Sequence, residues 1–164
     1  MILVSVGTNE ARFDRLLRAV AELPGAERRL VQHGHSTAIP GPGVELVDFL
    51  SFEELTEAIR RCRAFVTHAG VGSVLVALAN GRRPVVVPRR RAFGEAVDDH
   101  QLELGRRFAA AGLVTLVEQP EALAAALAEG GHDATVKPRA GALAADLRDY
   151  LSSAVGRAAV PARA

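Results

Sequence analysis

Cysteine is nearly absent from this chain of 164 residues, which contains Cys62 alone. One thiol excludes an internal disulfide framework, and it also excludes a zinc site built mainly from cysteines. Disulfides are rare in reducing compartments, so the composition favours a cytoplasmic protein. Cys62 lies on the apolar face of a predicted helix, where a core role is expected rather than a catalytic one.

Long hydrophobic runs and an excess of one charge are missing as well. Residues 2–6 and 84–88 form apolar runs of strand length, whereas about 20 apolar residues are needed to span a bilayer. The first residues lack the basic leader of a signal peptide, so we expect a soluble chain that is not exported. A formal net charge of +1 argues against a general nucleic-acid binder, and no nucleic-acid partner is expected.

The chain does contain short apolar runs that alternate with segments of helical periodicity. Apolar residues make up 49% of the chain, enough for one core, and we expect a single domain over residues 1–155 with a disordered tail at 156–164. Strands are predicted at 2–6, 29–32, 44–49, 64–67, 84–87 and 113–117. Six strands, each followed by a helix, predict an α/β fold with a Rossmann-like, doubly wound parallel sheet.

Two stretches have the pattern of a helix start. Ser51 and Glu54 form an S-x-x-E capping box, which predicts a helix whose inward face carries Phe52, Leu55, Ile59 and Cys62. Asp98 and Gln101 resemble a second capping box. Other helices are predicted from residue 13, at 73–80, from residue 120 and at 141–151.

Doubly wound sheets bind ligands at the carboxyl ends of their strands, which here precede the loops at 7–9, 32–36, 68–73 and 88–101. Residues 67–73 read Thr-His-Ala-Gly-Val-Gly-Ser, a strand that leads into Gly-x-Gly-Ser at a helix start. Backbone N–H groups in such a turn bind anions, which favours a phosphate ligand. The alternative is a tight turn that needs glycine only for packing. Neither a P-loop nor the complete dinucleotide fingerprint is present.

The loop at 88–101 is the most highly charged of the four. It begins with the basic run Arg89, Arg90 and Arg91, and it ends with Asp99, His100 and Gln101 at the next helix start. The arginines are either a solvated run or a phosphate contact. Side chains that both donate and accept hydrogen bonds suit the hydroxyls of a sugar. Helix capping is the alternative role for Asp98 and Gln101.

Four short motifs carry a family resemblance. They are Val-x-Val-Gly-Thr at 4–8, His-Ala-Gly-x-Gly-Ser at 68–73, Gly-x-x-Pro-x-Val-x-Pro at 81–88 and Asp-His-Gln-Leu at 99–102. In this order they resemble the C-terminal, donor-binding domain of glycosyltransferase family 28, over roughly residues 1–117. More narrowly, the chain is similar to the small soluble subunit of two-part transferases of the dolichol pathway and of bacterial exopolysaccharide synthesis. The resemblance implies the C-terminal half of a GT-B fold.

The resemblance also implies roles for individual residues. The UDP diphosphate would bind at Gly70, Gly72 and Ser73, with the turn at Gly7 and Thr8 beside it. Uracil would lie near Phe49 and Leu50. Ribose or sugar hydroxyls would contact Asp99, His100 and Gln101, and the diphosphate would have a further contact from Arg89, Arg90 or Arg91.

Two positions need separate interpretation. Dolichol-pathway subunits have a ribose-binding glutamate where this chain has Val76, so either another carboxylate such as Glu95 holds the ribose or the donor is held differently. His68 is a candidate general base, but in this fold the base usually comes from the missing N-terminal half. We therefore expect His68 to support the loop and assign no catalytic residue.

The resemblance predicts the donor-binding subunit of an inverting UDP-sugar glycosyltransferase. This hexosyltransferase would act on a lipid-linked or polysaccharide acceptor, held at the inner face of the membrane by a membrane-anchored partner subunit, and would be inactive alone. No metal ion or other cofactor is expected. A non-catalytic nucleotide-binding or regulatory domain with the same sheet is the alternative.

Overall fold

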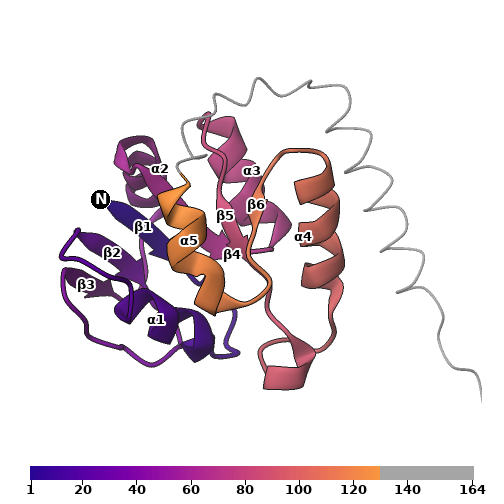
Figure 1. The fold of residues 1–164 in the computed structure, drawn as a ribbon, viewed down its shortest axis with the longest axis horizontal. Helices are drawn as coiled ribbons and strands as arrows, with labels where there is room; N and C mark the ends of the chain where they lie inside the picture. The colour runs from indigo at the N-terminus through magenta and orange to yellow at the C-terminus, as the bar shows by residue number, and fades with distance from the viewer. Residues whose placement is uncertain (130–164) are drawn as a thin grey trace, which may run out of the picture.

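The computed structural model describes residues 1–129, which form a six-stranded sheet flanked by helices (Figure 1). The strands lie in the order β3-β2-β1-β4-β5-β6, and each neighbouring pair is parallel. Their bounds are β1 (Ile2–Ser5), β2 (Arg29–Gln32), β3 (Val44–Val47), β4 (Ala64–His68), β5 (Val85–Val87) and β6 (Thr115–Leu116). The predicted doubly wound α/β sheet is confirmed, and its order reverses between β1 and β4.

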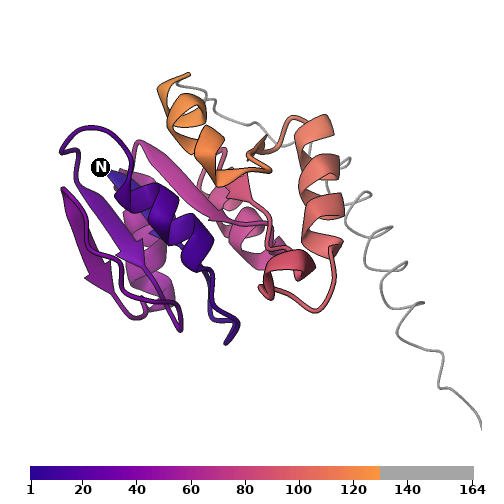
Figure 2. The same ribbon diagram turned by 60° about the horizontal axis from the view of Figure 1, so that its bottom comes forward.

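Helices cover both faces of this sheet, as Figures 1 and 2 show. One face packs against α1 and α5, and the other packs against α2, α3 and α4. The bounds are α1 (Asp14–Ala21), α2 (Phe52–Arg61), α3 (Val71–Ala79), α4 (His100–Ala110) and α5 (Leu123–Ala128), with single 3₁₀ turns η1 (Arg91–Phe93) and η2 (Pro120–Ala122).

The central strands are mostly apolar up to the polar residues at their carboxyl ends, because both of their faces are covered. On β1, Val4 belongs to the core beneath α1, whereas Leu3 belongs to the core beneath α2. On β4, Val66 belongs to the core beneath α1, and Phe65 belongs to the core beneath α2. Burial on alternating sides makes a continuous apolar run the expected pattern for a parallel strand.

The start of α2 follows the sequence prediction. Ser51 Oγ accepts from the Glu54 N–H at 3.2 Å, and Glu54 Oε2 accepts from the Ser51 N–H at 2.8 Å, which completes the capping box. Cys62 at the other end of the helix is 1% exposed and belongs to the core. Burial raises the pKa of its thiol, which disfavours the reactive thiolate.

The pattern of a helix after every strand does not hold for β2, where residues 33–43, rich in glycine and proline, form the loop that their composition indicates. Two further details of the sequence prediction are wrong. Phe52 is not a core residue, since it lies in the first turn of α2 with 65% of its surface exposed. The second capping box does not form: Asp99 is the N-cap of α4, without a side-chain capping bond.

The remaining boundaries differ by a few residues. The structure begins α3 at Val71 instead of residue 73, and it shortens the last strand to Thr115–Leu116. The predicted helix at 141–151 and the predicted tail at 156–164 lie outside the described residues, as does the predicted domain end at 155.

Candidate functional site

A cleft of about 460 Å³ lies at the carboxyl edge of the sheet, where the strand order reverses between β1 and β4. Its wall contains six residues that were singled out from the sequence: Gly7, Thr8, Leu50, His68, Gly72 and Ser73. The wall also contains Ser5, Asn9, Gln32, Leu55 and Val76. The fold therefore brings together loops that are far apart in sequence, at the position where doubly wound sheets bind ligands.

The start of α3 forms one side of the cleft. Its N-cap is Gly70, which has no side chain to cap the helix. The N–H groups of a first helical turn have no carbonyl partner within the helix. A Cβ atom placed on Gly72 would meet no atom within 4 Å, so the backbone there is open. Open amides and the partial positive charge of the helix start suit an anion such as phosphate.

The imidazole of His68 contacts this turn at two points. Its Nδ1 atom accepts from the Gly70 N–H at 3.0 Å, and its Nε2 atom lies 3.1 Å from Ser73 Oγ. Burial, together with the positive charge of Arg89, lowers the pKa of His68 to about 4, although a hydrogen bond with Gln101 acts in the opposite direction. The ring is therefore neutral near pH 7, and its contacts are those of a support for the loop.

Two buried polar side chains in the cleft wall, Ser5 and Gln32, were missed by sequence reasoning. Ser5 Oγ donates to Gln32 Oε1 at 2.8 Å, and Gln32 Nε2 donates to the carbonyl oxygen of Gly7 at 3.2 Å. These bonds hold the turn at Gly7, whose φ of 77° requires glycine. Ser5 is the last residue of β1 and Gln32 is the last residue of β2, and a polar residue at the carboxyl end of a strand is the signal that would have identified them.

Leu50 and Phe49, which were expected to border uracil, lie in the loop between β3 and α2. Leu50 lines the cleft together with Leu55 and Val76. Phe49 is beside it, 47% exposed, with its ring edge against His35 at a centroid distance of 5.5 Å. This wall is apolar, which suits the faces of a planar base better than it suits charged groups.

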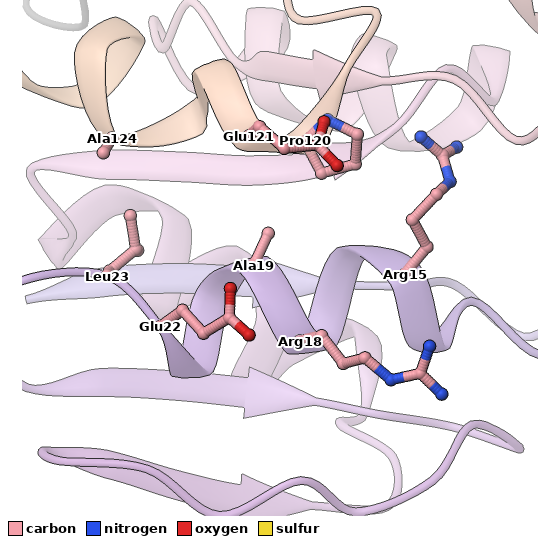
Figure 3. Close-up of a pocket in the computed structure, with 8 residues that line it drawn as sticks. All are labelled: Arg15, Arg18, Ala19, Glu22, Leu23, Pro120, Glu121 and Ala124. Atoms are coloured by element: carbon pink, nitrogen blue, oxygen red, sulfur yellow. The ribbon is translucent and has the colours of Figure 1, made fainter.

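Glu95 does not lie in the cleft wall, and the structure corrects its predicted role as a ribose ligand. It is 4% exposed and forms an ion pair with Arg15 at 2.9 Å, while its Oε2 also accepts from the Arg90 N–H at 3.0 Å. Arg15 belongs to α1, where it lines a separate hollow of about 420 Å³ between α1 and the η2–α5 segment (Figure 3). Both carboxylate oxygens of Glu95 are therefore committed to internal contacts.

Arg89 is likewise an internal residue, so its predicted contact with a diphosphate is also corrected. Its side chain is 1% exposed and donates to the carbonyl oxygens of Val6 at 2.9 Å and Ala11 at 2.7 Å. Its guanidinium also lies 4.7 Å from the centre of the Phe13 ring. These contacts tie the loop after β5 to the loop after β1, which lines the cleft.

The neighbouring arginines remain closer to solvent. Arg90 is partly buried and its Nε lies 3.4 Å from Asp99 Oδ1, which also accepts from the backbone N–H of Arg91 at 3.1 Å. The side chain of Arg91 is exposed. Through these two contacts Asp99 holds the segment with Arg90 and Arg91 beside the start of α4.

Gln101 connects two strand ends. Its Oε1 atom accepts from the backbone N–H groups of Ala69 and Arg89, each at 3.2 Å. That bridge explains why Gln101 does not cap α4 with Asp98. Asp98 instead contacts the ring and the backbone N–H of His100, and these two hydrogen bonds lower the pKa of the Asp98 carboxyl.

Comparison with known proteins gives one family match over most of the chain. The model of the glycosyltransferase family 28 C-terminal domain matches residues 1–149. Among solved structures, the calicheamicin glycosyltransferase CalG4 is similar with a TM-score of 0.61 and 21% identity, over 97% of this chain and 44% of CalG4. At that identity the likeness shows the fold alone, here shared with a GT-B glycosyltransferase.

Two curated relatives are similar in sequence. A UDP-N-acetylglucosamine–N-acetylmuramyl-(pentapeptide) pyrophosphoryl-undecaprenol N-acetylglucosamine transferase from Rhodospirillum centenum is 38% identical over 77 residues, which are 47% of this chain and 19% of the relative. The human UDP-N-acetylglucosamine transferase subunit ALG13 is 30% identical over 119 residues, which are 65% of this chain and 10% of the relative. The matched part is thus less than a fifth of either relative's length.

Proposed function

The chain belongs to the glycosyltransferase family 28 C-terminal domain family, and we propose that it is the donor-binding subunit of an inverting UDP-sugar glycosyltransferase. One observation carries this proposal. The uncapped start of α3, the turn at Gly7 and the apolar wall at Leu50 surround one cleft at the switch point of the sheet. Such a cleft offers anion-binding amides on one side and a surface for a base on the other.

In the proposed complex the diphosphate of the donor lies against Gly72 and Ser73. Leu50 and Phe49 border the uracil, and Val76 forms an apolar patch between base and phosphate. Thr8 and Asn9 then replace a carboxylate as polar partners for the ribose. The sugar extends toward Asp99, His100 and Gln101, while the exposed Arg91 is the arginine available to reach the diphosphate.

Transfer would proceed by displacement at the anomeric carbon. The acceptor oxygen attacks from the face opposite the leaving group and loses its proton to a base that we place on the other half of a GT-B enzyme. As the bond to the diphosphate breaks, its electron pair leaves with UDP. Fixed N–H donors at Gly72 and Ser73, helped by the helix dipole, would stabilise that charge as it develops.

Calorimetric titration tests the nucleotide site. We expect the chain to bind UDP at least about tenfold more tightly than AMP. Gly72→Leu should weaken UDP binding by about tenfold or more, because its side chain enters the space where the phosphate lies. The fold should survive, since a Cβ atom on Gly72 meets nothing within 4 Å.

Ala79→Leu supplies the matched control, because it adds similar bulk at the exposed far end of the same helix. Equal affinity for UDP and AMP would favour a general nucleotide-binding domain. Unchanged UDP affinity in Gly72→Leu would remove the diphosphate from the start of α3.

We also propose that transfer requires a membrane-anchored partner subunit, which holds this chain at the inner face of the membrane. Within residues 1–129 no helix is long and apolar enough to cross a bilayer. The name of the human relative describes a transferase subunit, and the relative from Rhodospirillum centenum is named for a polyprenol-linked substrate. The first name supports a second polypeptide in the enzyme, and the second name supports a lipid-linked acceptor.

An activity assay with radiolabelled UDP-N-acetylglucosamine, the donor named in both relatives, tests this second proposal. The purified chain should transfer no label to lipid, and addition of membranes from the source cell should restore transfer. The same membranes with the Gly72→Leu variant should restore none. Efficient transfer by the chain alone would contradict the need for a partner.

A further inference from the structure

The Gly70 N–H beside Nδ1 favours one tautomer of the His68 ring. Gly70 N–H is a donor, so Nδ1, which lies 3.0 Å away, must present a lone pair. A neutral imidazole with a lone pair on Nδ1 carries its proton on Nε2. The Nε2–H group therefore donates to Ser73 Oγ across the 3.1 Å separation.

We propose that His68 is a positioning residue, which occupies an acceptor site of Ser73 Oγ and so leaves the serine hydroxyl to donate to an anionic oxygen in the cleft. Ser73 Oγ cannot donate to Nε2, because that nitrogen already bears a proton. Its O–H can turn toward the cleft that Ser73 lines. This inference rests on the proposed UDP site and assigns the diphosphate as the acceptor of that hydrogen bond.

The His68 ring lies between Gly7 and Gly70, which leave it little freedom to rotate. A Cβ atom on Gly7 would lie 2.5 Å from His68 Nε2, and one on Gly70 would lie 2.6 Å from Nδ1. The two glycines thus form a slot that only their lack of side chains makes possible. A ring fixed in this slot keeps Nδ1 beside the Gly70 N–H and Nε2 beside Ser73 Oγ, so a ring flip does not reverse the hydrogen bond at Ser73.

The hydrogen bonds of His68 distinguish a general base from a residue that positions Ser73. A general base needs a free lone pair facing the reacting hydroxyl, and neither ring nitrogen has one here: Nδ1 accepts from Gly70 and Nε2 carries the proton. A hydroxyl set as a donor matches phosphate oxygens, which only accept. Charge-assisted bonds of this kind are stronger than neutral ones. His68 thus acts on the ligand through Ser73 without touching it.

A double-mutant cycle on UDP affinity tests the inference. Asparagine at position 68 can keep an oxygen near the site of Nδ1 for the Gly70 N–H, but it has no donor that reaches Ser73. We expect Ser73→Ala to weaken UDP binding about tenfold and His68→Asn to weaken it by several fold. In the Ser73→Ala background, His68→Asn should cause no further loss. His33→Asn, a loop histidine outside the cleft wall, is the matched control.

An equal loss from His68→Asn in both backgrounds would overturn the proposal, because it would show that His68 acts through the loop alone. Nitrogen-15 NMR of the imidazole gives an independent measurement. We expect the proton on Nε2 and a ring that stays neutral at pH 6; a proton on Nδ1 would overturn the assignment. Absence of UDP binding in the wild-type chain would defeat the proposed function, while the NMR result would still decide the tautomer.

Discussion

Replacement of Arg89 by methionine should lower the free energy of unfolding by about 3 kcal/mol or more. Its guanidinium is 1% exposed and donates to backbone carbonyls of Val6, Ala11, Arg12 and Glu95. Methionine fills much of the space and donates no hydrogen bond, so these carbonyls lose their partner. A buried acceptor left without a donor costs about 1–3 kcal/mol.

Urea unfolding followed by circular dichroism measures this effect. Arg91→Met is the matched control, since Arg91 lies in the same loop and its side chain is exposed. That variant should remain within about 0.5 kcal/mol of the wild type. Equal urea midpoints for the two variants would show that the buried guanidinium does not stabilise the fold.

Gly70→Ala should lower both the thermal stability and the UDP affinity. The new Cβ atom would lie 2.6 Å from Nδ1 of His68, closer than nonbonded atoms approach, so either the ring or the turn must move. Either movement breaks the bond from Gly70 N–H to the ring. We expect a loss of about 1–3 kcal/mol in stability, as for overpacked cores, and a loss of about tenfold in UDP affinity.

A second substitution identifies the cause. In a His68→Ala background the ring is gone, so Gly70→Ala should cost little further stability. Gly72→Ala places the same methyl group two residues along, where nothing lies within 4 Å, and should leave the melting temperature nearly unchanged. Undiminished destabilisation in the His68→Ala background would exclude steric contact with the ring.

Several features were predictable because they depend on neighbours in sequence. The capping box needs only Ser51 and Glu54, three residues apart, and both bonds form. The apolar runs predicted the sheet because a strand that is buried on both faces is mostly apolar. The glycines and serine at 70–73 predicted an uncapped helix start, because a strand-to-helix turn of that composition leaves backbone amides free.

The residues whose roles changed all depend on partners far away along the chain. Glu95 was a plausible ribose ligand until the fold placed it against Arg15, 80 residues earlier. Nothing in the run of three arginines distinguishes Arg89 from Arg91, yet one is buried and the other exposed. Phe52 has the helical spacing of the apolar residues in α2, but it lies in the first turn of that helix, where the core does not cover it.

By itself the sequence determined the order of strands and helices along the chain, the position of the glycine-rich turn before α3 and the family. These follow from local spacing, burial pattern and backbone freedom, which short segments encode. Only the tertiary structure decided which polar groups face the cleft. Arg89 reaches the carbonyl of Val6 across 83 residues, and Gln101 accepts from Ala69 across 32. Buried polar groups must find a partner, and the sheet order, not sequence proximity, determines which partner is near.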